Sequence, residues 1–384
     1  MKKKILIILI IFILSGCYNY KELNKIAIVS SIAIDKEDNQ YLVSAQVMNV
    51  KSDEESQSSN VIVYSAKGKS IEEAMRKMTT KTSRKLYGGH ISKLVLSEDI
   101  AKEGIINVID MFQRLTEIKD EFTITIAKGI EANKVIKIST SPEAVPADYV
   151  KSSILNTDVD AALTHSSKLD EFISYYLKDN IDPVISVIEV KNYKEKGTTV
   201  DNANSTSQET KIIVNNIAIT HNGVLEDYLT EDETIGYNYI RNKVEKMLIP
   251  IKCDNTNYAS ISILNSKTKN KVTNKNNLYH IDINVKAKAM ITEYNCSEDL
   301  TKENVILDLQ KKTEKKIKKY MNKVIDVQNS SESEFLGLKR TIYLNYPKYT
   351  NEDYDLNISV NVNLQRKGEI RNSSKGAKNE YKNK

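Results

Sequence analysis

The three cysteines of this 384-residue chain, Cys17, Cys253 and Cys296, are the residues whose chemistry is most specific. A cysteine is a buried apolar side chain, one half of a disulfide, or a nucleophile to which another group becomes attached. Cys17 directly follows Gly16, close to the amino terminus and at the end of an apolar run. Its type alone leaves all three roles open, so its surroundings have to decide.

The residues before Cys17 form a pattern that is typical of an export signal. The chain begins with the positive block MKKK, continues with the apolar run ILIILIIFIL, and then has the small residues Ser15 and Gly16. Ten helical residues cover only about half of the bilayer core, whereas a spanning helix needs about 20. An uncleaved membrane helix is the alternative, but the pattern favours a signal peptide over residues 1–16.

The sequence LSGC, which ends at Cys17, resembles the lipobox of bacterial lipoproteins. The resemblance implies cleavage just before Cys17 and an S-diacylglycerol group on its thiol, with N-acylation of the new amino terminus as an option. Ser15 and Gly16 suit this chemistry because small side chains let a peptidase approach the chain. Two acyl chains hold a protein stably on a membrane, at about 0.8 kcal/mol per buried methylene. The sequence therefore predicts a lipid-anchored protein.

Cys253 and Cys296 remain as an even number of thiols in an exported protein if Cys17 is lipidated. They flank two alternating apolar and polar stretches, 258–264 and 278–291, which the polar segment VTNKNN joins as a turn. If the two cysteines occupy paired positions of this hairpin, its turn is centred near residues 274–275. We predict a disulfide between them, and two separate thiols near strand ends are the alternative.

No catalytic constellation is recognisable in the sequence. The four histidines are far apart and lack metal-type spacing, and the chain has no HExxH, CxxC, GxSxG or phosphate-loop motif. The four histidines are His90, His165, His221 and His280. His90 follows two glycines at a strand start, and His221-Asn-Gly223 fits a hairpin turn better than a ligand site. We expect no catalytic residue, cofactor or metal, and hence no enzyme.

Composition indicates an ordinary globular body, with 40% hydrophobic and 28% charged residues. The net charge of +5 is concentrated at the two ends, in the lysines of the signal and in the tail from Arg371 to Lys384. The body between them is slightly negative, which argues against nucleic acid as a partner. The tail 372–384 is basic and poor in apolar residues, so we expect it to be disordered.

Strand and helix patterns interleave along the chain, which predicts an α+β fold with mixed or antiparallel sheets flanked by helices. Strands are expected at 27–34, 41–48, 61–66, 91–96, 122–127, 184–190, 211–220, 224–229, 258–264, 278–291 and 356–364, and helices at 70–78, 99–112, 131–138, 169–177, 230–248 and 301–324. The last helix has a lysine-rich outer face, KKTEKKIKK, which we interpret as solvated. Contact of this face with anionic lipid or a partner is the alternative.

The polar segment 191–210 has no hydrophobic period, and we interpret it as an exposed loop or interdomain linker. It would separate an N-terminal α+β region, 17–190, from a C-terminal α+β domain, 211–371. The length of the chain allows two or three domains, and the N-terminal region is long enough for two subdomains.

Several stretches, taken in order, resemble the Ger(x)C family of spore-germination lipoproteins. They are GCYNYKELNKIAIVSSIAID, AKGKSIEEAMRKMTTKTSRKLYGGHISKLVLSEDIAKEGI, FISYYLKDNIDPVISVIEV and IAITHNGVLEDYLTEDETIGYNYIRNKV. The chain departs from the family pattern at Tyr18 and Tyr349, where the family favours Trp, and at Glu334, where it favours Asp. These changes put in doubt specific roles for those positions rather than the fold.

The resemblance implies a fold of three small α+β domains made of sheets flanked by helices. It also implies a non-enzymatic subunit of a spore germinant receptor, lipid-anchored on the outer face of the spore inner membrane or cell membrane. Its partners would be the A-type and B-type multi-pass membrane subunits, and its role receptor assembly and germination signalling. A solute-binding lipoprotein of a nutrient transporter is the alternative. About six residues separate Cys17 from the first predicted ordered segment, and they reach at most about 20 Å. That short tether favours the receptor subunit, whose body would lie against the membrane.

Overall fold

The computed structural model describes residues 25–49, 60–115, 117–119, 121–143, 145–276, 278–350 and 353–365. The predicted signal peptide, Cys17 and the basic tail 372–384 lie outside these ranges. The predictions about them therefore continue to rest on the sequence.

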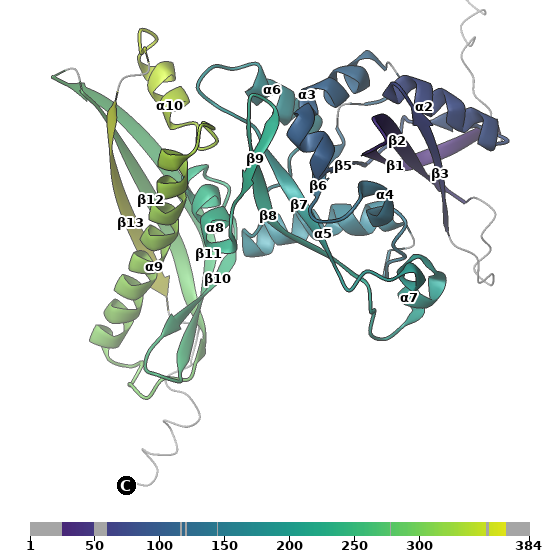
Figure 1. Cartoon of the computed structure of the whole chain (residues 1–384). Coiled ribbons are helices and arrows are strands. Elements are labelled where there is room, and N and C mark those ends of the chain that lie inside the picture. Colours follow the sequence, from purple (N-terminus) through teal and green to yellow (C-terminus); the bar gives the residue numbers. More distant parts are fainter. Residues whose placement is uncertain are drawn as a thin grey trace, which may run out of the picture.

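The N-terminal part of the chain builds one mixed sheet, called the first sheet below (Figure 1). Its strands are β1 (Ile26–Glu37), β2 (Gln40–Met48), β3 (Val61–Gly68), β4 (Lys85–Tyr87), β5 (Lys93–Ser97), β6 (Thr123–Ala127), β7 (Val184–Lys191), β8 (Lys211–His221) and β9 (Val224–Tyr228). Their order is β3-β2-β1-β5-β6-β7-β8-β9, and β4 pairs with β1. The central pairs β1–β5, β5–β6 and β6–β7 are parallel, whereas the outer pairs are antiparallel.

Helices cover both faces of the first sheet. They are α2 (Ile71–Met78), α3 (Glu98–Arg114), α4 (Ala132–Val135), α5 (Pro146–Ala161) and α6 (Leu169–Tyr176). Because successive strand residues point to opposite faces, Leu94 packs in the cluster with α2, α3 and α6, while Val95 packs in the cluster with α4 and α5. Every residue of β5 and β6 is buried as a result. Such two-sided burial is typical of parallel strands.

The C-terminal part of the chain builds a second sheet, with strand order β10-β11-β12-β13 (Figure 1). Its strands are β10 (Met247–Lys252), β11 (Tyr258–Lys275), β12 (Leu278–Tyr294) and β13 (Tyr354–Gln365), and its helices are α8 (Glu231–Ile240), α9 (Glu303–Ser330) and α10 (Leu338–Asn345). The apolar residues of β12, such as Ile281 and Val285, join one core with residues of α8, α9 and α10. The residues between them point to the opposite face, so β12 alternates buried and more exposed positions.

The fold class predicted from the sequence is confirmed, because the structure is α+β with mixed sheets flanked by helices. Two local predictions were wrong. The helix expected over 230–248 ends at Ile240, because Asn242 takes the left-handed conformation (φ 57°) and the alternating residues that follow form β10. The turn expected near 274–275 lies at Asn276 (φ 53°), since β11 continues through Lys275, which pairs with Leu278.

In the segment 191–210, which the sequence predicts as an exposed loop or interdomain linker, most residues are exposed. It contains a 3₁₀ turn (Glu195–Thr198) and helix α7 (Val200–Asn204), and Asn202 in that helix is buried. It connects β7 to β8, which are antiparallel neighbours in the first sheet. Strand pairing therefore places β8 and β9 with the N-terminal part, and the change from the first sheet to the second occurs after β9.

Of the helices in the described ranges, none combines the length and the apolar character that a bilayer crossing requires.

Candidate functional site

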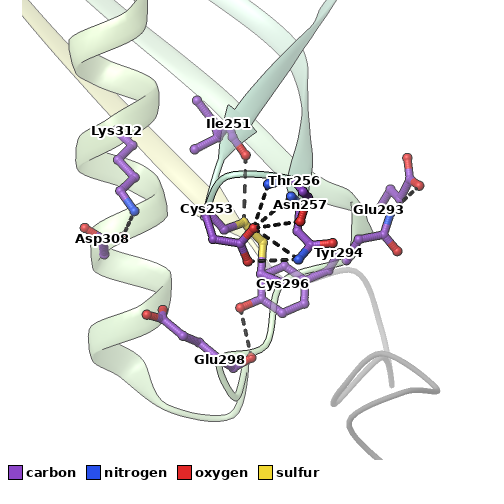
Figure 2. The surroundings of a disulfide bond; sticks show 12 residues. Ile251, Cys253, Thr256, Asn257, Glu293, Tyr294, Cys296, Glu298, Asp308 and Lys312 are labelled. Atoms are coloured by element: carbon purple, nitrogen blue, oxygen red, sulfur yellow. Dashed lines mark hydrogen bonds and ion pairs between the residues drawn. A yellow bond between two sulfur atoms is a disulfide. The ribbon is translucent and has the colours of Figure 1, made fainter.

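Cys253 and Cys296 lie at one end of the second sheet, and the structure joins their sulfur atoms in a disulfide (Figure 2). Their Cα atoms are 5.9 Å apart, within the range that disulfides require. The two residues are not paired across the β11–β12 hairpin, because Cys253 follows β10 and β11 lies between β10 and β12. The turn from β10 to β11 instead brings Cys253 to the end of β12, where Cys296 follows Tyr294.

The turn that carries Cys253 is held by its own hydrogen bonds (Figure 2). The Cys253 amide donates to the Asn257 carbonyl at 3.0 Å, and the Asp254 carboxylate accepts from the amides of Thr256 and Asn257, each at 2.9 Å. These bonds and the Asn257 side chain, which contributes most, lower the pKa of Asp254 to about 2. Hydrogen bonds therefore hold this turn in addition to the disulfide.

His165 is the centre of the main ionisable cluster that the sequence did not single out. It is 4% exposed, its Nε2 lies 3.1 Å from Glu171 Oε2, and its Nδ1 lies 3.9 Å from Asp158 Oδ2. Lys243 Nζ lies 3.4 Å from the other oxygen of Glu171. These side chains line a surface cavity of about 470 Å³ where α5 and α6 meet the segment after α8.

The ionisable groups of this cluster stabilise one another's charged forms. Burial would raise the pKa of Glu171, but the hydrogen bond and charge of His165 and the nearby Lys243 lower it to about 2. Burial raises the pKa of Asp158, although His165 opposes this effect. Imidazole and carboxylate are the groups of acid–base catalysis, yet here they bind one another and Ser166. The cluster fastens the helices of the first sheet to the segment that leads into the second.

The other histidines lie on separate elements, as the sequence spacing indicated. His90 contacts the ring of Tyr87, with centroids 6.0 Å apart, and His221 Nδ1 lies 3.5 Å from Asp182. His280 Nδ1 lies 3.3 Å from Asp355. Within the described residues, no group of three or more His, Cys, Asp or Glu side chains is arranged to hold a metal ion.

Two carboxylates of the N-terminal part hold the segment that follows α9. Glu226 of β9 accepts from Ser331 Oγ at 2.7 Å and from the amides of residues 332 and 333, each at 3.1 Å. Asp182 accepts from the Glu334 amide at 2.8 Å and from the Asn222 amide at 3.1 Å. Carboxylates that accept several backbone N–H groups form strong, charge-assisted bonds. These bonds form a junction between the two sheets.

Arg241 completes this junction and was missed by the sequence analysis. Its guanidinium donates to the Leu336 carbonyl at 3.3 Å and to the Tyr175 hydroxyl at 3.0 Å. Gly337 has a φ of 63°, and a Cβ added to it would lie 2.8 Å from Arg241 Nη1 and 2.9 Å from Ile181 Cδ1. In the sequence, the only local signal for this contact was Gly337. Its segment departs from the family pattern at Glu334.

Two sequence-family models match the chain one after the other. The model described as "Spore germination protein N-terminal domain" matches residues 19–190, and "Spore germination B3/ GerAC like, C-terminal" matches residues 215–373. The division between the two models falls in the segment 191–214. The strand pairing differs from it, because β8 and β9 complete the first sheet.

Similar proteins cover nearly the whole chain. Spore germination protein KC of Bacillus subtilis (strain 168) is 26% identical over 355 residues, which are 90% of this chain and 87% of that protein. Spore germination protein GerQC of Bacillus cereus is 20% identical over 92% of this chain and 94% of its own length. The crystal structure of the GerBC protein has the same fold, with a TM-score of 0.54 and 19% identity, over 87% of this chain and 96% of that one.

Proposed function

The chain belongs to the family of GerAC-like spore germination proteins, and on this premise we propose that it is the lipid-anchored, non-enzymatic subunit of a spore germinant receptor. Its role would be to support receptor assembly and nutrient-triggered germination signalling. The observation that carries the proposal is the ordered match of both family domains, which begins two residues after Cys17.

The proposed anchor is Cys17, cleaved from residues 1–16 and modified with diacylglycerol on the outer face of the membrane. Eight residue-to-residue steps separate Cys17 from Lys25, where the described structure begins, and they span at most about 28 Å. A tether of that length would keep the first sheet near the bilayer, beside the multi-pass A-type and B-type subunits that we propose as partners. The pairing of ionisable groups around His165 supports a structural role for that cluster rather than catalysis.

Replacing the proposed lipidation site tests the anchor. We expect Cys17→Ala to leave the precursor uncleaved or to release the protein into the aqueous phase of a detergent partition, because no thiol is left to carry the acyl chains. Mass spectrometry of the amino-terminal peptide should find the lipid in the parent chain. Ser15→Ala is the matched control, since it keeps both a small residue and the thiol. A Cys17→Ala protein that is processed and stays in the membrane would refute the anchor.

Deletion of the gene tests the receptor role separately. We expect spores without the protein to lose the response to at least one nutrient, and the parent gene to restore that response. Normal germination with every nutrient, in a strain that has no related gene, would refute the proposal. Specific binding of a small nutrient by the isolated protein would favour the alternative, a solute-binding lipoprotein of a transporter.

A further inference from the structure

The outer face of the second sheet, away from the core, has a concentrated positive charge. Four lysines of β11 and β12 line a hollow of about 460 Å³ together with four asparagines of β11, β12 and β13. We call this set the basic face, and its members are Lys267, Lys269, Lys286, Lys288, Asn265, Asn284, Asn361 and Asn363. None of the described residues that line the hollow is Asp or Glu.

The strand register sets two of these lysines against each other. Lys267 pairs directly with Lys286, and paired residues of antiparallel strands have Cβ atoms about 5 Å apart. Like charges at such positions repel, so this pair costs stability in the free protein. Among the described residues, none of the four lysines has a carboxylate oxygen within 4.0 Å. By contrast, Lys312 on α9 pairs with Asp308 at 2.7 Å.

We propose that the basic face binds an extended acidic segment of a partner protein. Lysines two residues apart on one strand, such as Lys267 and Lys269, are about 6.6 Å apart, and acidic residues two apart in an extended chain have the same spacing. The asparagine amides beside them can donate to and accept from the backbone of such a segment. An acidic occupant would also relieve the repulsion between Lys267 and Lys286.

Two other occupants fit less well. The chain's own tail leaves the sheet after Gln365, next to the basic face, but the segment 366–384 has seven Lys or Arg and only two Glu. Its positive charge would be repelled. A flat bilayer does not fill a hollow, and the second sheet lies at the opposite end of the molecule from β1, which follows the anchor (Figure 1). The last argument rests on the proposed anchoring at Cys17.

Peptide binding to the full-length chain in detergent micelles tests the proposal. The probe is a fluorescent peptide of alternating Glu and Ser, and its comparison peptide has the same composition with the Glu residues in one block. We expect the alternating peptide to bind more tightly. Replacing all four lysines of the basic face by Gln should weaken its binding by about tenfold or more, because each replacement removes an ion pair with a Glu side chain of the peptide.

The matched control removes the same charge elsewhere. Lys311, Lys315, Lys318 and Lys319 lie exposed on α9, and their replacement by Gln should change peptide affinity less than about threefold, through long-range charge alone. Equal losses from both quadruple variants, or equal binding of the two peptides, would overturn the proposal. So would loss of binding to phosphatidylglycerol vesicles in the basic-face variant without any loss of peptide binding, because that result identifies lipid as the occupant.

A smaller change guards against misfolding of the quadruple variant. We expect Lys286→Gln alone to fold, to unfold at a slightly higher temperature because the pair with Lys267 is removed, and still to bind the peptide more weakly. A Lys286→Gln protein with unchanged affinity would also count against the basic face. Peptide binding does not depend on acylation, so this result and the Cys17→Ala result can fail independently.

Discussion

The two sheets place lysine side chains in opposite environments. In the first sheet, helices on both faces bury β5 completely, and Lys93 at its start is 1% exposed. In the second sheet, helices pack against one face, and Lys286 and its neighbours are exposed on the other. The number of sheet faces that helices cover, rather than the strand itself, therefore determines how much a lysine lowers the stability of the fold.

Burial of Lys93 lowers the stability of the first sheet. Its Nζ has no hydrogen-bond partner among the described residues, and burial, with a smaller effect of Lys151, lowers the pKa of its amine to about 7. Burying an ammonium group without a partner is unfavourable, so the buried amine loses its proton at a lower pH than an exposed lysine does. On the second sheet, the lysines are exposed, and the loss of stability comes from the repulsion between Lys267 and Lys286.

The largest expected effect concerns the disulfide, which stabilises the second sheet. Cys253→Ser with Cys296→Ser removes a cross-link that closes a loop of 43 residues and should cost about 4 kcal/mol of unfolding free energy in the chain-entropy model. Hydrogen exchange should rise mainly in β10 and β11 and much less in β5 and β6. A thiol count on the denatured, unreduced protein checks whether the disulfide is present. Two free thiols would contradict the disulfide and, with it, this prediction.

The next effect concerns the first sheet. Lys93→Met should raise the unfolding free energy at pH 7 by about 3 kcal/mol, because it removes a buried amine that the unfolded chain holds in its charged form. The unfolded lysine keeps its proton up to its ordinary pKa of 10.5, whereas the folded one loses it near pH 7. Stability of the parent chain should therefore rise with pH between about 7 and 10.5.

The Lys93→Met variant should lack that rise, and denaturant unfolding at several pH values measures it. Lys315→Met on the exposed face of α9 is the control, and its pH dependence should match that of the parent chain. A parent protein whose stability is flat from pH 7 to pH 10 would show that the amine of Lys93 reaches solvent or a partner.

The smallest effect concerns the junction that joins the two sheets. Gly337→Ala should cost about 2 kcal/mol, because its φ of 63° strains an L-residue and the new Cβ meets Arg241 and Ile181. Gly129→Ala separates the two causes, since Gly129 has a φ of 69° but no atom within 4 Å of an added Cβ. It should cost only about 1 kcal/mol. Equal costs in thermal unfolding would mean that the junction tolerates the methyl group.

Local patterns predicted the elements well where neighbours in sequence decide. The hairpin around His221-Asn-Gly223 matches β8 and β9, with Asn222 and Gly223 in left-handed conformations. Helix α5 was not predicted, since its apolar residues do not form a clear stripe along one face and its start at Pro146 was the only local signal. The strand β10 was missed because its alternation was taken as the end of a helix, and Pro250 is tolerated there on an edge strand.

Other features depend on residues that lie far apart in the chain. Asp182 and Glu334 are separated by 152 positions, and nothing near either one indicates that they meet. The same holds for Arg241 beside Gly337, and for Lys243 beside Glu171. Each of these contacts forms only when distant segments of the chain pack together.

The sequence by itself determined the α+β class, the alternating strands of the second sheet and the lipid-anchor prediction at Cys17. These depend on periodicity and short motifs, which residues within a few positions of each other express. The tertiary structure alone decided that β8 and β9 belong to the first sheet, that Lys93 is buried while Lys286 is exposed, and that Cys253 reaches Cys296 from the turn after β10 rather than across the β11–β12 hairpin. The physical reason is that burial and proximity depend on which layers cover a strand, and distant segments supply those layers.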